Sequence, residues 1–296
     1  MKKLGRLLTA MVTPFNEEGG VDYEQAKRLA SALLNSGSDG ILVVGTTGES
    51  PTLLREEELR LFSEVKSAIG ERGTVIAGTG SNSTAEALKT TKEAERIGVD
   101  ACLLVVPYYN KPTQEGLYQH FKAIAESTSL PCILYNVPSR TVVNLSADTT
   151  IKLSHIDNII GIKEASGNLG QISKIISNTR EDFIVWSGND SDTLLILTLG
   201  GYGVVSVASH LVGNQIKEMI DNFINGKTDK AAKIHRHLLP LVNALFIVSN
   251  PIPVKYALNY IGFNVGKPRL PLTEPDEKSA ATIRDTLKNY HIDLPV

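Results

Sequence analysis

Sulfur-containing residues and tryptophan are scarce in this sequence, which has two cysteines, three methionines and one tryptophan. Cys102 and Cys132 each lie within an apolar run, so we expect two buried, reduced thiols rather than a disulfide or a metal-binding pair. The six histidines are scattered, and no pair of histidines or cysteines has the spacing of metal ligands. The sequence therefore predicts no metal site.

The chain also lacks a strong charge of either sign and a long apolar run. Its net charge of −2 excludes the basic surface that binding to nucleic acid or to an anionic membrane requires. No apolar run nears the roughly 20 residues of a membrane span. Gly5 and Arg6 interrupt the apolar stretch that would make the first residues a signal peptide. We expect a soluble, cytoplasmic protein.

What the sequence does have is a series of short apolar runs rich in β-forming residues, repeated about every 20 to 34 residues. The runs span residues 7–15, 40–46, 74–80, 101–109, 131–138, 159–166, 183–190 and 203–209. Between the first four of these runs lie apolar residues at helical spacing. The runs themselves are apolar throughout, which is typical of parallel strands covered by helices. Eight such units predict a (β/α)8 barrel, or TIM barrel, over residues 1–226. An open doubly wound sheet is the alternative.

The β-rich runs stop after Gly226. The remaining sequence has helical patterns over residues 231–249, with Pro240 inside, and over 254–261 and 276–289. We therefore expect a helical C-terminal extension over residues 227–296.

One lysine stands out among the small and hydroxyl residues that follow the predicted strands, where a barrel carries its chemistry. Lys163 lies in the apolar segment IIGIKEAS, where an unpaired charge is costly. One interpretation is a structural ion pair, for instance with Glu164, although adjacent strand residues point to opposite faces. The other is a nucleophilic amine, because desolvation favours the neutral form that attacks a ketone.

The segment GTTGES (45–50) follows the second predicted strand. It lacks the Gly-Lys-Ser/Thr of a phosphate-binding loop, and Gly78-Thr-Gly80 lacks the third glycine of a dinucleotide-binding motif. Backbone N–H groups and the Thr46 and Thr47 hydroxyls therefore fit a small carboxylate better than a nucleotide.

Three tyrosines and an arginine also follow predicted strands. Tyr108, Tyr109 and Tyr135 are either core residues or, beside an amine nucleophile, proton shuttles. Arg140 is either a surface ion-pair residue or a bidentate clamp for a substrate carboxylate.

Together these segments resemble the dihydrodipicolinate synthase/N-acetylneuraminate lyase family, and its synthase branch most closely. The resemblance runs in order through essentially the whole predicted barrel. It is carried by GTTGES (45–50), AGTGSNSTAEA (77–87), VVPYYNKPTQEG (105–116), YNVPSRT (135–141), GIKEASG (161–167) and SGND (187–190).

The resemblance implies a lyase of lysine and diaminopimelate biosynthesis that condenses pyruvate with L-aspartate-4-semialdehyde. Lys163 would form a Schiff base with pyruvate, with no other cofactor, and the enamine formed from it would attack the aldehyde. Thr46, Tyr135 and Tyr109 match the proton relay of the family, in which Tyr109 reaches into the site of a neighbouring subunit.

Four further positions match substrate-binding residues of the family. Thr47 would bind the carboxylate of pyruvate, Arg140 would guide the semialdehyde, and Gly188 and Val205 would place their backbone beside the site. The resemblance also implies a homotetramer built as a dimer of dimers.

Alternatives to the synthase remain within the family and outside it. Within the family they are N-acetylneuraminate lyases and 2-keto-3-deoxy sugar acid aldolases or dehydratases. Arg140 and Tyr109 together favour the synthase branch over these. From another functional class, a solute-binding module is also α/β and of this length. Such a module would need an export signal and would leave a buried lysine unexplained.

Related enzymes that respond to L-lysine bind it at a dimer interface, and we expect such inhibition to be weak or absent here. Arg55 and Glu58 stand where lysine-sensitive bacterial members commonly carry histidines, and a guanidinium would repel the side-chain ammonium of the ligand. Glu58 would partly neutralise Arg55, and residues 55–58 are alternatively just a solvated helix start. The positions that match this site are Ser50, Arg55, Glu58, Asn82, Glu86 and Tyr108.

Overall fold

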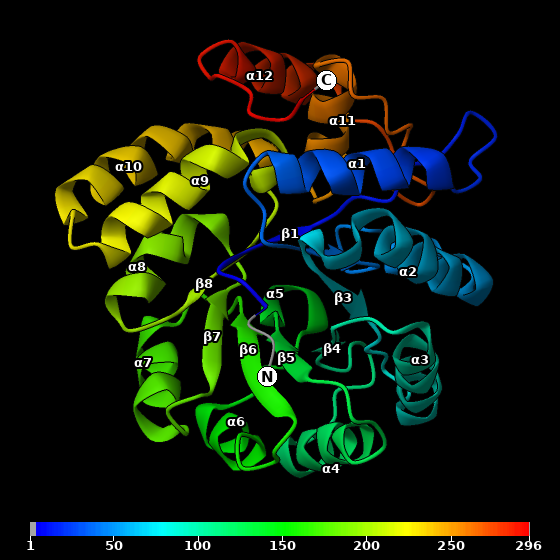
Figure 1. Cartoon of the computed structure of the whole chain (residues 1–296), viewed down its shortest axis with the longest axis vertical. Helices are drawn as coiled ribbons and strands as arrows, with labels where there is room; N and C mark the ends of the chain where they lie inside the picture. The colour runs from blue at the N-terminus through cyan, green and yellow to red at the C-terminus, as the bar shows by residue number, and fades with distance from the viewer. Residues whose placement is uncertain (1–3, 296) are drawn as a thin grey trace. The chain divides into compact units, whose positions relative to one another are not determined.

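The computed structural model describes residues 4–295, and its eight strands form one closed parallel barrel in the order β1 to β8 (Figure 1). The predicted (β/α)8 barrel is confirmed, and the alternative of an open sheet is wrong. The strands are β1 (Leu7–Ala10), β2 (Gly40–Val43), β3 (Thr74–Gly78), β4 (Ala101–Val105), β5 (Cys132–Asn136), β6 (Ile159–Glu164), β7 (Ile184–Ser187) and β8 (Gly203–Ser206).

Every predicted apolar run contains one strand, but the strands end earlier than the runs do. The run over 101–109, for example, leaves the sheet after Val105, just before Pro107, which has no backbone N–H for a ladder. The residues beyond each strand form the loops that carry the predicted site.

Helices alternate with the strands, and three more follow the barrel. Pro240 lies inside the first of these three, as predicted. None of the helices within residues 4–295 is long and apolar enough to cross a membrane. The helices are α1 (Tyr23–Asn35), α2 (Arg55–Ile69), α3 (Thr84–Ile97), α4 (Gln114–Ala125), α5 (Pro138–Thr141), α6 (Ala147–Leu153), α7 (Leu169–Asn178), α8 (Thr193–Thr198), α9 (Ser209–Ile224), α10 (Thr228–Leu245), α11 (Ile252–Tyr260) and α12 (Glu277–Leu287).

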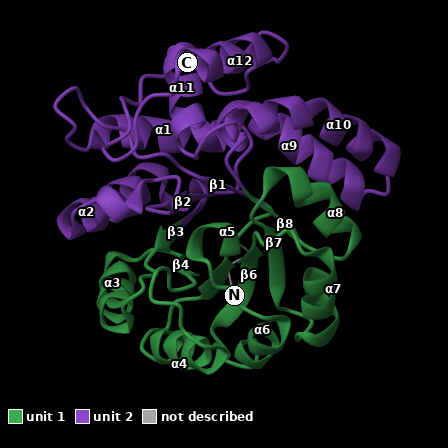
Figure 2. Ribbon diagram, turned by 180° about the vertical axis from the view of Figure 1, so that it is seen from behind, with its two compact units in different colours: residues 1–6, 76–205 green, residues 7–75, 206–296 purple. Residues whose placement is uncertain are grey.

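The chain divides into two compact units (Figure 2). The first unit contains residues 1–6 and 76–205, and the second contains residues 7–75 and 206–296. The C-terminal helices therefore belong to the same unit as β1, β2 and the loops that follow them. The predicted boundary between residues 226 and 227 stays a prediction, and residues 1–3 and 296 of the predicted ranges lie outside the described part.

A buried histidine in the core of the second unit has hydrogen-bond partners for both its ring nitrogens. His210 is completely buried, its Nδ1 donates to the carbonyl of Val207 (2.8 Å), and its Nε2 accepts from the backbone N–H of Val12 (3.2 Å). This arrangement requires a neutral ring, because a proton on Nε2 would point at the Val12 N–H. Burial accordingly lowers the pKa of His210 from 6.5 to about 4.

Acid should destabilise the protein through this histidine. Below pH 6.5 the unfolded chain protonates the residue while the folded protein does not, so the free energy of unfolding should fall as the pH drops from 6.5 towards 4. The contribution is up to about 3 kcal/mol. Urea denaturation at a series of pH values measures it. His120, whose pKa burial also lowers to about 4, shares this dependence, so His210→Gln, which keeps one donor and one acceptor, should reduce it, whereas His237→Gln at an exposed histidine should not. An unchanged slope in His210→Gln would contradict the neutral buried ring.

Candidate active site

Lys163 and Tyr135 lie opposite each other on neighbouring strands of the first unit. β5 pairs with β6 so that Tyr135 is aligned with Lys163, and each residue is only 6% exposed. The Nζ atom of Lys163 lies 4.2 Å from the centroid of the Tyr135 ring, within the range of a cation–π contact. The strand pairing thus brings the predicted nucleophile together with a predicted proton-transfer group.

The next aligned pair on the same strands, Asn136 and Glu164, forms a different set of contacts. The Glu164 carboxylate accepts hydrogen bonds from Asn136 Nδ2 (3.1 Å to each oxygen), from the backbone N–H of Ser166 (2.7 Å) and from Gln171 Nε2 (3.2 Å). Burial raises the pKa of Glu164, and these donors act in the opposite direction. Because the carboxylate is bound by these three groups, the interpretation of Lys163 as an ion-pair partner of Glu164 is wrong.

Gly188, which follows β7, packs against the Lys163 side chain. Its backbone N–H donates to the Glu164 carbonyl (2.7 Å). A Cβ atom placed on Gly188 would lie 2.6 Å from the Ala165 Cβ and 3.2 Å from the Lys163 Cγ. Glycine is therefore required here by close approach. Val205, the other predicted backbone position, is buried in β8, the next strand of the barrel.

Arg140 lies on the short helix α5, which follows β5 directly. The sequence pattern did not predict this helix. Thr141 holds the loop, because its hydroxyl group shares one proton between the carbonyls of Val143 (2.8 Å) and Val137 (3.2 Å). Arg140 itself is exposed. Arg140, the residue predicted to bind a substrate carboxylate, thus lies at the surface, in a segment that Thr141 holds in place.

The loop after β4 presents Tyr109 to the outside in an unfavourable backbone conformation. Tyr109 is 89% exposed and has a φ of 75°, which is costly for a bulky residue. The Tyr108 carbonyl accepts from Asn82 Nδ2 (3.1 Å) and from the Asn110 N–H (3.0 Å), and Asn110 Nδ2 donates to the Asn82 carbonyl (2.8 Å). Three hydrogen bonds therefore fix the backbone around a ring that itself is largely solvated.

In the second unit, the loop after β2 carries Thr46 and Thr47. The backbone N–H of Gly48 donates to the Gly45 carbonyl (3.0 Å), which closes a tight turn. Thr47 is 3% exposed, and its Oγ1 accepts from Asn250 Nδ2 (3.0 Å). The structure thus brings these two hydroxyl residues together in a loop that the C-terminal part of the chain contacts.

A buried ion pair beside this loop was not predicted from the sequence. The Nζ atom of Lys255 lies 2.8 Å from Oε1 of Glu49, and the two side chains are 0% and 1% exposed. The signal was present in the sequence, because Lys255 is a lone lysine in the apolar segment PVKYALNYIG, just as Lys163 is in IIGIKEAS. The sequence did not show which distant residue would neutralise the charge of Lys255.

The predicted lysine-binding positions fall into both units. In the first unit, Asn82 supports the Tyr108 carbonyl, and Glu86 lies in the first turn of α3. In the second unit, Ser50 begins a 3-10 turn over Ser50–Thr52, and Arg55 and Glu58 lie in the first turn of α2. The role of these six residues stays a prediction.

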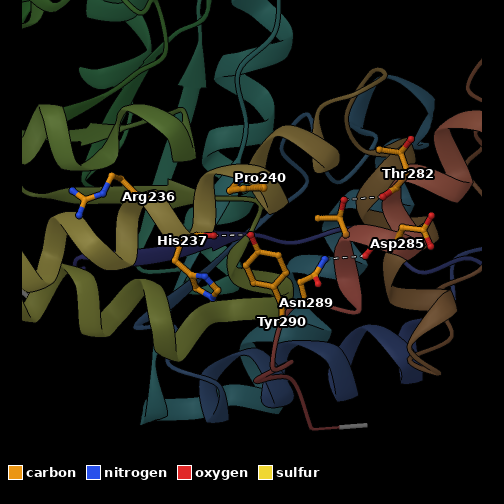
Figure 3. Close-up of a pocket in the computed structure, with 8 residues that line it drawn as sticks. Arg236, His237, Pro240, Thr282, Asp285, Asn289 and Tyr290 are labelled. Atoms are coloured by element: carbon orange, nitrogen blue, oxygen red, sulfur yellow. Dashed lines mark hydrogen bonds between the residues drawn. The ribbon is translucent and has the colours of Figure 1, made fainter.

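Other features of the described residues lie away from these loops. Cys102 and Cys132 are free and buried, as predicted. Among residues 4–295, no group of three or more His, Cys, Asp or Glu side chains is arranged to hold a metal ion. A hollow of about 670 Å³ on α10 and α12 is lined by Arg236, His237 and Tyr290, among others, and by none of the predicted site residues (Figure 3).

Comparison with known proteins identifies the family. The model of the dihydrodipicolinate synthetase family matches residues 3–290. The chain belongs to the dihydrodipicolinate synthetase family. It is 70% identical over 296 residues to a 4-hydroxy-tetrahydrodipicolinate synthase of Dehalococcoides mccartyi, with 100% of both chains covered.

Solved structures agree with this assignment. A dihydrodipicolinate synthase from Bacillus anthracis is 47% identical with a TM-score of 0.96, covering 98% of this chain and 100% of that one. A dihydrodipicolinate synthase from Cyanidioschyzon merolae with lysine bound is 48% identical with a TM-score of 0.95, covering 97% and 98%. The predicted family is confirmed, and the chain is an enzyme of the dihydrodipicolinate synthetase family.

Gly188→Ala should impair this enzyme by displacing the stem of Lys163. The added methyl group would meet the Ala165 Cβ at 2.6 Å and the Lys163 Cγ at 3.2 Å, so the backbone at Ala165 must shift and the Lys163 stem must give way with it. A displacement of about 1 Å at a reacting group costs roughly a hundredfold in kcat/KM. Steady-state kinetics measures the loss. Gly170→Ala on α7, where the nearest atom would lie 3.4 Å from the added carbon, is the matched control. Unchanged kinetics in Gly188→Ala would show that the close approach has no catalytic consequence.

Proposed function

We propose that Lys163 carries the 4-hydroxy-tetrahydrodipicolinate synthase activity of this chain by forming a Schiff base with pyruvate. The observation that supports this most is the amine of a buried lysine lying over the Tyr135 ring, while the neighbouring Glu164 is occupied by other donors. The neutral amine attacks the ketone carbon of pyruvate, and loss of water gives an iminium ion.

The iminium ion makes the rest of the reaction possible. It withdraws electrons from the adjacent methyl group, which loses a proton to give an enamine. The enamine carbon attacks the aldehyde of L-aspartate-4-semialdehyde, and the aldehyde oxygen takes up a proton. The amino group of the adduct then attacks the imine carbon, which closes the ring and releases Lys163. Because the iminium ion is the electron sink, the cycle requires no further cofactor.

The remaining predicted residues take supporting roles in this proposal. Tyr135, Thr46 and Tyr109 transfer protons, since a hydroxyl group both donates and accepts. Thr47 binds the carboxylate of pyruvate, and Arg140 pairs with the carboxylate of the semialdehyde. We assign Thr46 and Thr47 from their family motif, GTTGES (45–50).

Tyr109 acts on a neighbouring subunit in this proposal. Its ring is 89% exposed, and the backbone that presents it is strained and held by Asn82 and Asn110. Strained conformations of this kind cluster at functional sites. On the family resemblance, the proposal also includes a homo-oligomer, a tetramer built from two dimers, working in the cytoplasm on the two small substrates.

Reduction with borohydride in the presence of pyruvate should leave a stable adduct on Lys163 and abolish activity. Borohydride reduces the iminium ion to a secondary amine that no longer hydrolyses. Peptide mass spectrometry locates the modified lysine. Lys163→Arg should give no adduct and no activity, because a guanidinium stays protonated, whereas Lys288→Arg on the surface should behave as the unmodified protein. Trapping on Lys255 or another lysine would refute the mechanism.

Two inactive variants should complement each other if Tyr109 acts in the partner subunit. Tyr109→Phe and Thr46→Val are each expected to be inactive, because each lacks one hydroxyl of the relay. After subunit exchange, half of the dimers are mixed and one of their two sites has both hydroxyls, so about a quarter of the activity should return. Exchange is verified by native mass spectrometry. No recovery despite complete exchange would show that Tyr109 serves its own subunit.

A further inference from the structure

The loop after β2 is strained at both ends. Val44 and Glu49 have φ angles of 59° and 58°, in the left-handed region that side chains other than glycine rarely occupy. Thr46 and Thr47 lie between them. A loop in this conformation persists only where its surroundings hold it, so the contacts of Glu49 decide how the two threonine hydroxyls are presented.

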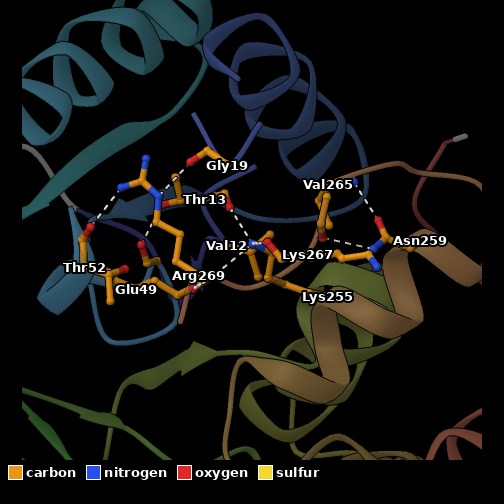
Figure 4. A network of polar contacts seen from close by, with 12 residues as sticks. Val12, Thr13, Gly19, Glu49, Thr52, Lys255, Asn259, Val265, Lys267 and Arg269 are labelled. Atoms are coloured by element: carbon orange, nitrogen blue, oxygen red, sulfur yellow. Dashed lines mark hydrogen bonds and ion pairs between the residues drawn. The ribbon is translucent and has the colours of Figure 1, made fainter. Parts of the chain in front are cut away.

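Glu49 is held by residues of the C-terminal extension (Figure 4). Its Oε1 accepts from Lys255 Nζ (2.8 Å), and its Oε2 accepts from the backbone N–H of Arg269 (2.9 Å). Lys255 is 0% exposed, and its ammonium group also donates to the carbonyls of Thr13 (3.0 Å) and Lys267 (3.1 Å). All three protons of the ammonium group are therefore used, which leaves the amine no free position for chemistry of its own.

The same network reaches the two residues before Glu49. Thr13, whose carbonyl accepts from Lys255, donates from its Oγ1 to the Gly48 carbonyl (2.6 Å). Asn250, five positions before Lys255 in the chain, donates to the Thr47 hydroxyl oxygen (3.0 Å). Three successive loop residues thus each have a directional bond to a side chain in this cluster.

Stability alone does not account for such a pair. Taking two charges out of water costs about as much as their attraction returns, and apolar residues of the same shape often replace a buried ion pair without loss. Burial lowers the pKa of Lys255, and only the contact with Glu49 opposes this. What an apolar pair would not supply is a set of directional bonds to a strained backbone.

We propose that Lys255 is a positioning residue: through Glu49 it holds the Gly45–Glu49 turn in the conformation that presents Thr46 and Thr47 to the substrate. This inference rests on the proposed function, because it takes Thr47 as the ligand of the pyruvate carboxylate and Thr46 as part of the proton relay. Lys255 touches neither the substrate nor Lys163 in this role.

Lys255→Met tests the proposal, because methionine keeps the length of the stem and removes the charge and the donors. The KM for pyruvate should rise about tenfold, and kcat should fall by a similar factor as the two hydroxyls lose their fixed positions. The borohydride adduct should still form on Lys163 at saturating pyruvate, since that lysine is held by the first unit. Lys255→Met also leaves Glu49 buried without its partner, so the double variant Lys255→Met/Glu49→Gln, which has no lone buried charge, is measured beside it.

Three results separate positioning from a structural role. The double variant should recover thermal stability but keep the raised KM for pyruvate. Leu258→Ala, which leaves a cavity beside the helix that carries Lys255, should lower the Tm while leaving the KM for pyruvate unchanged. A KM for pyruvate within twofold of the unmodified protein in either Lys255 variant would overturn the proposal, and so would an equal rise in Leu258→Ala. Failure of the proposed function is distinguishable, because then the unmodified protein itself would show no adduct on Lys163.

Discussion

The cost of burying charged side chains is the constraint on which much of this structure depends. Two lysines, Lys163 and Lys255, and two glutamates, Glu49 and Glu164, lie inside the protein, and each requires compensation. Lys255 has a carboxylate and two carbonyls as acceptors, whereas Lys163 faces the ring of Tyr135. Both lysines are buried, but the surroundings of Lys255 saturate its amine. Burial of a lysine is thus not by itself a sign of chemistry, because its partners decide what it does.

The alternation of side chains along β5 and β6 keeps the two functions of these strands apart. Tyr135 and Lys163 are aligned, and so are the next residues, Asn136 and Glu164. The second pair is bonded together and to Gln171 on α7, which ties the strands to a covering helix. The proposed reactive pair, Tyr135 and Lys163, lies on strands that are fastened in this way and has little freedom to move, and precise placement is what catalysis by positioning requires.

The sequence predicted the barrel well because parallel strands buried on both faces must be apolar along their whole length. It predicted that Lys163, Tyr135, Arg140 and Gly188 lie at the ends of barrel strands and face the same end of the barrel. The structure aligns Tyr135 with Lys163 and packs Gly188 against the Lys163 side chain. It did not predict the contact between Glu49 and Lys255, which are 206 positions apart. A pattern of apolar and polar residues shows that a lysine is buried but not which distant carboxylate it meets, because that depends on tertiary packing.

The burial of charge also explains why residues of the C-terminal part of the chain pack against the loop after β2. A carboxylate as buried as that of Glu49 needs both its oxygens engaged, and neither partner comes from the loops of the barrel. Oε1 accepts from Lys255 on α11, and Oε2 accepts from the backbone N–H of Arg269 beyond it. Arg269 in turn forms a two-pronged pair with Glu57 in the first turn of α2 (2.6 and 2.7 Å), and this contact lowers the pKa of that carboxyl group. Residues after the barrel therefore hold the segment between β2 and α2 at its middle, through Glu49, and at the start of α2, through Glu57. A segment held at two points by charge-assisted bonds, one fully buried and one partly buried, cannot shift as a whole without breaking one of them, so the chain beyond the barrel is a structural support of this segment.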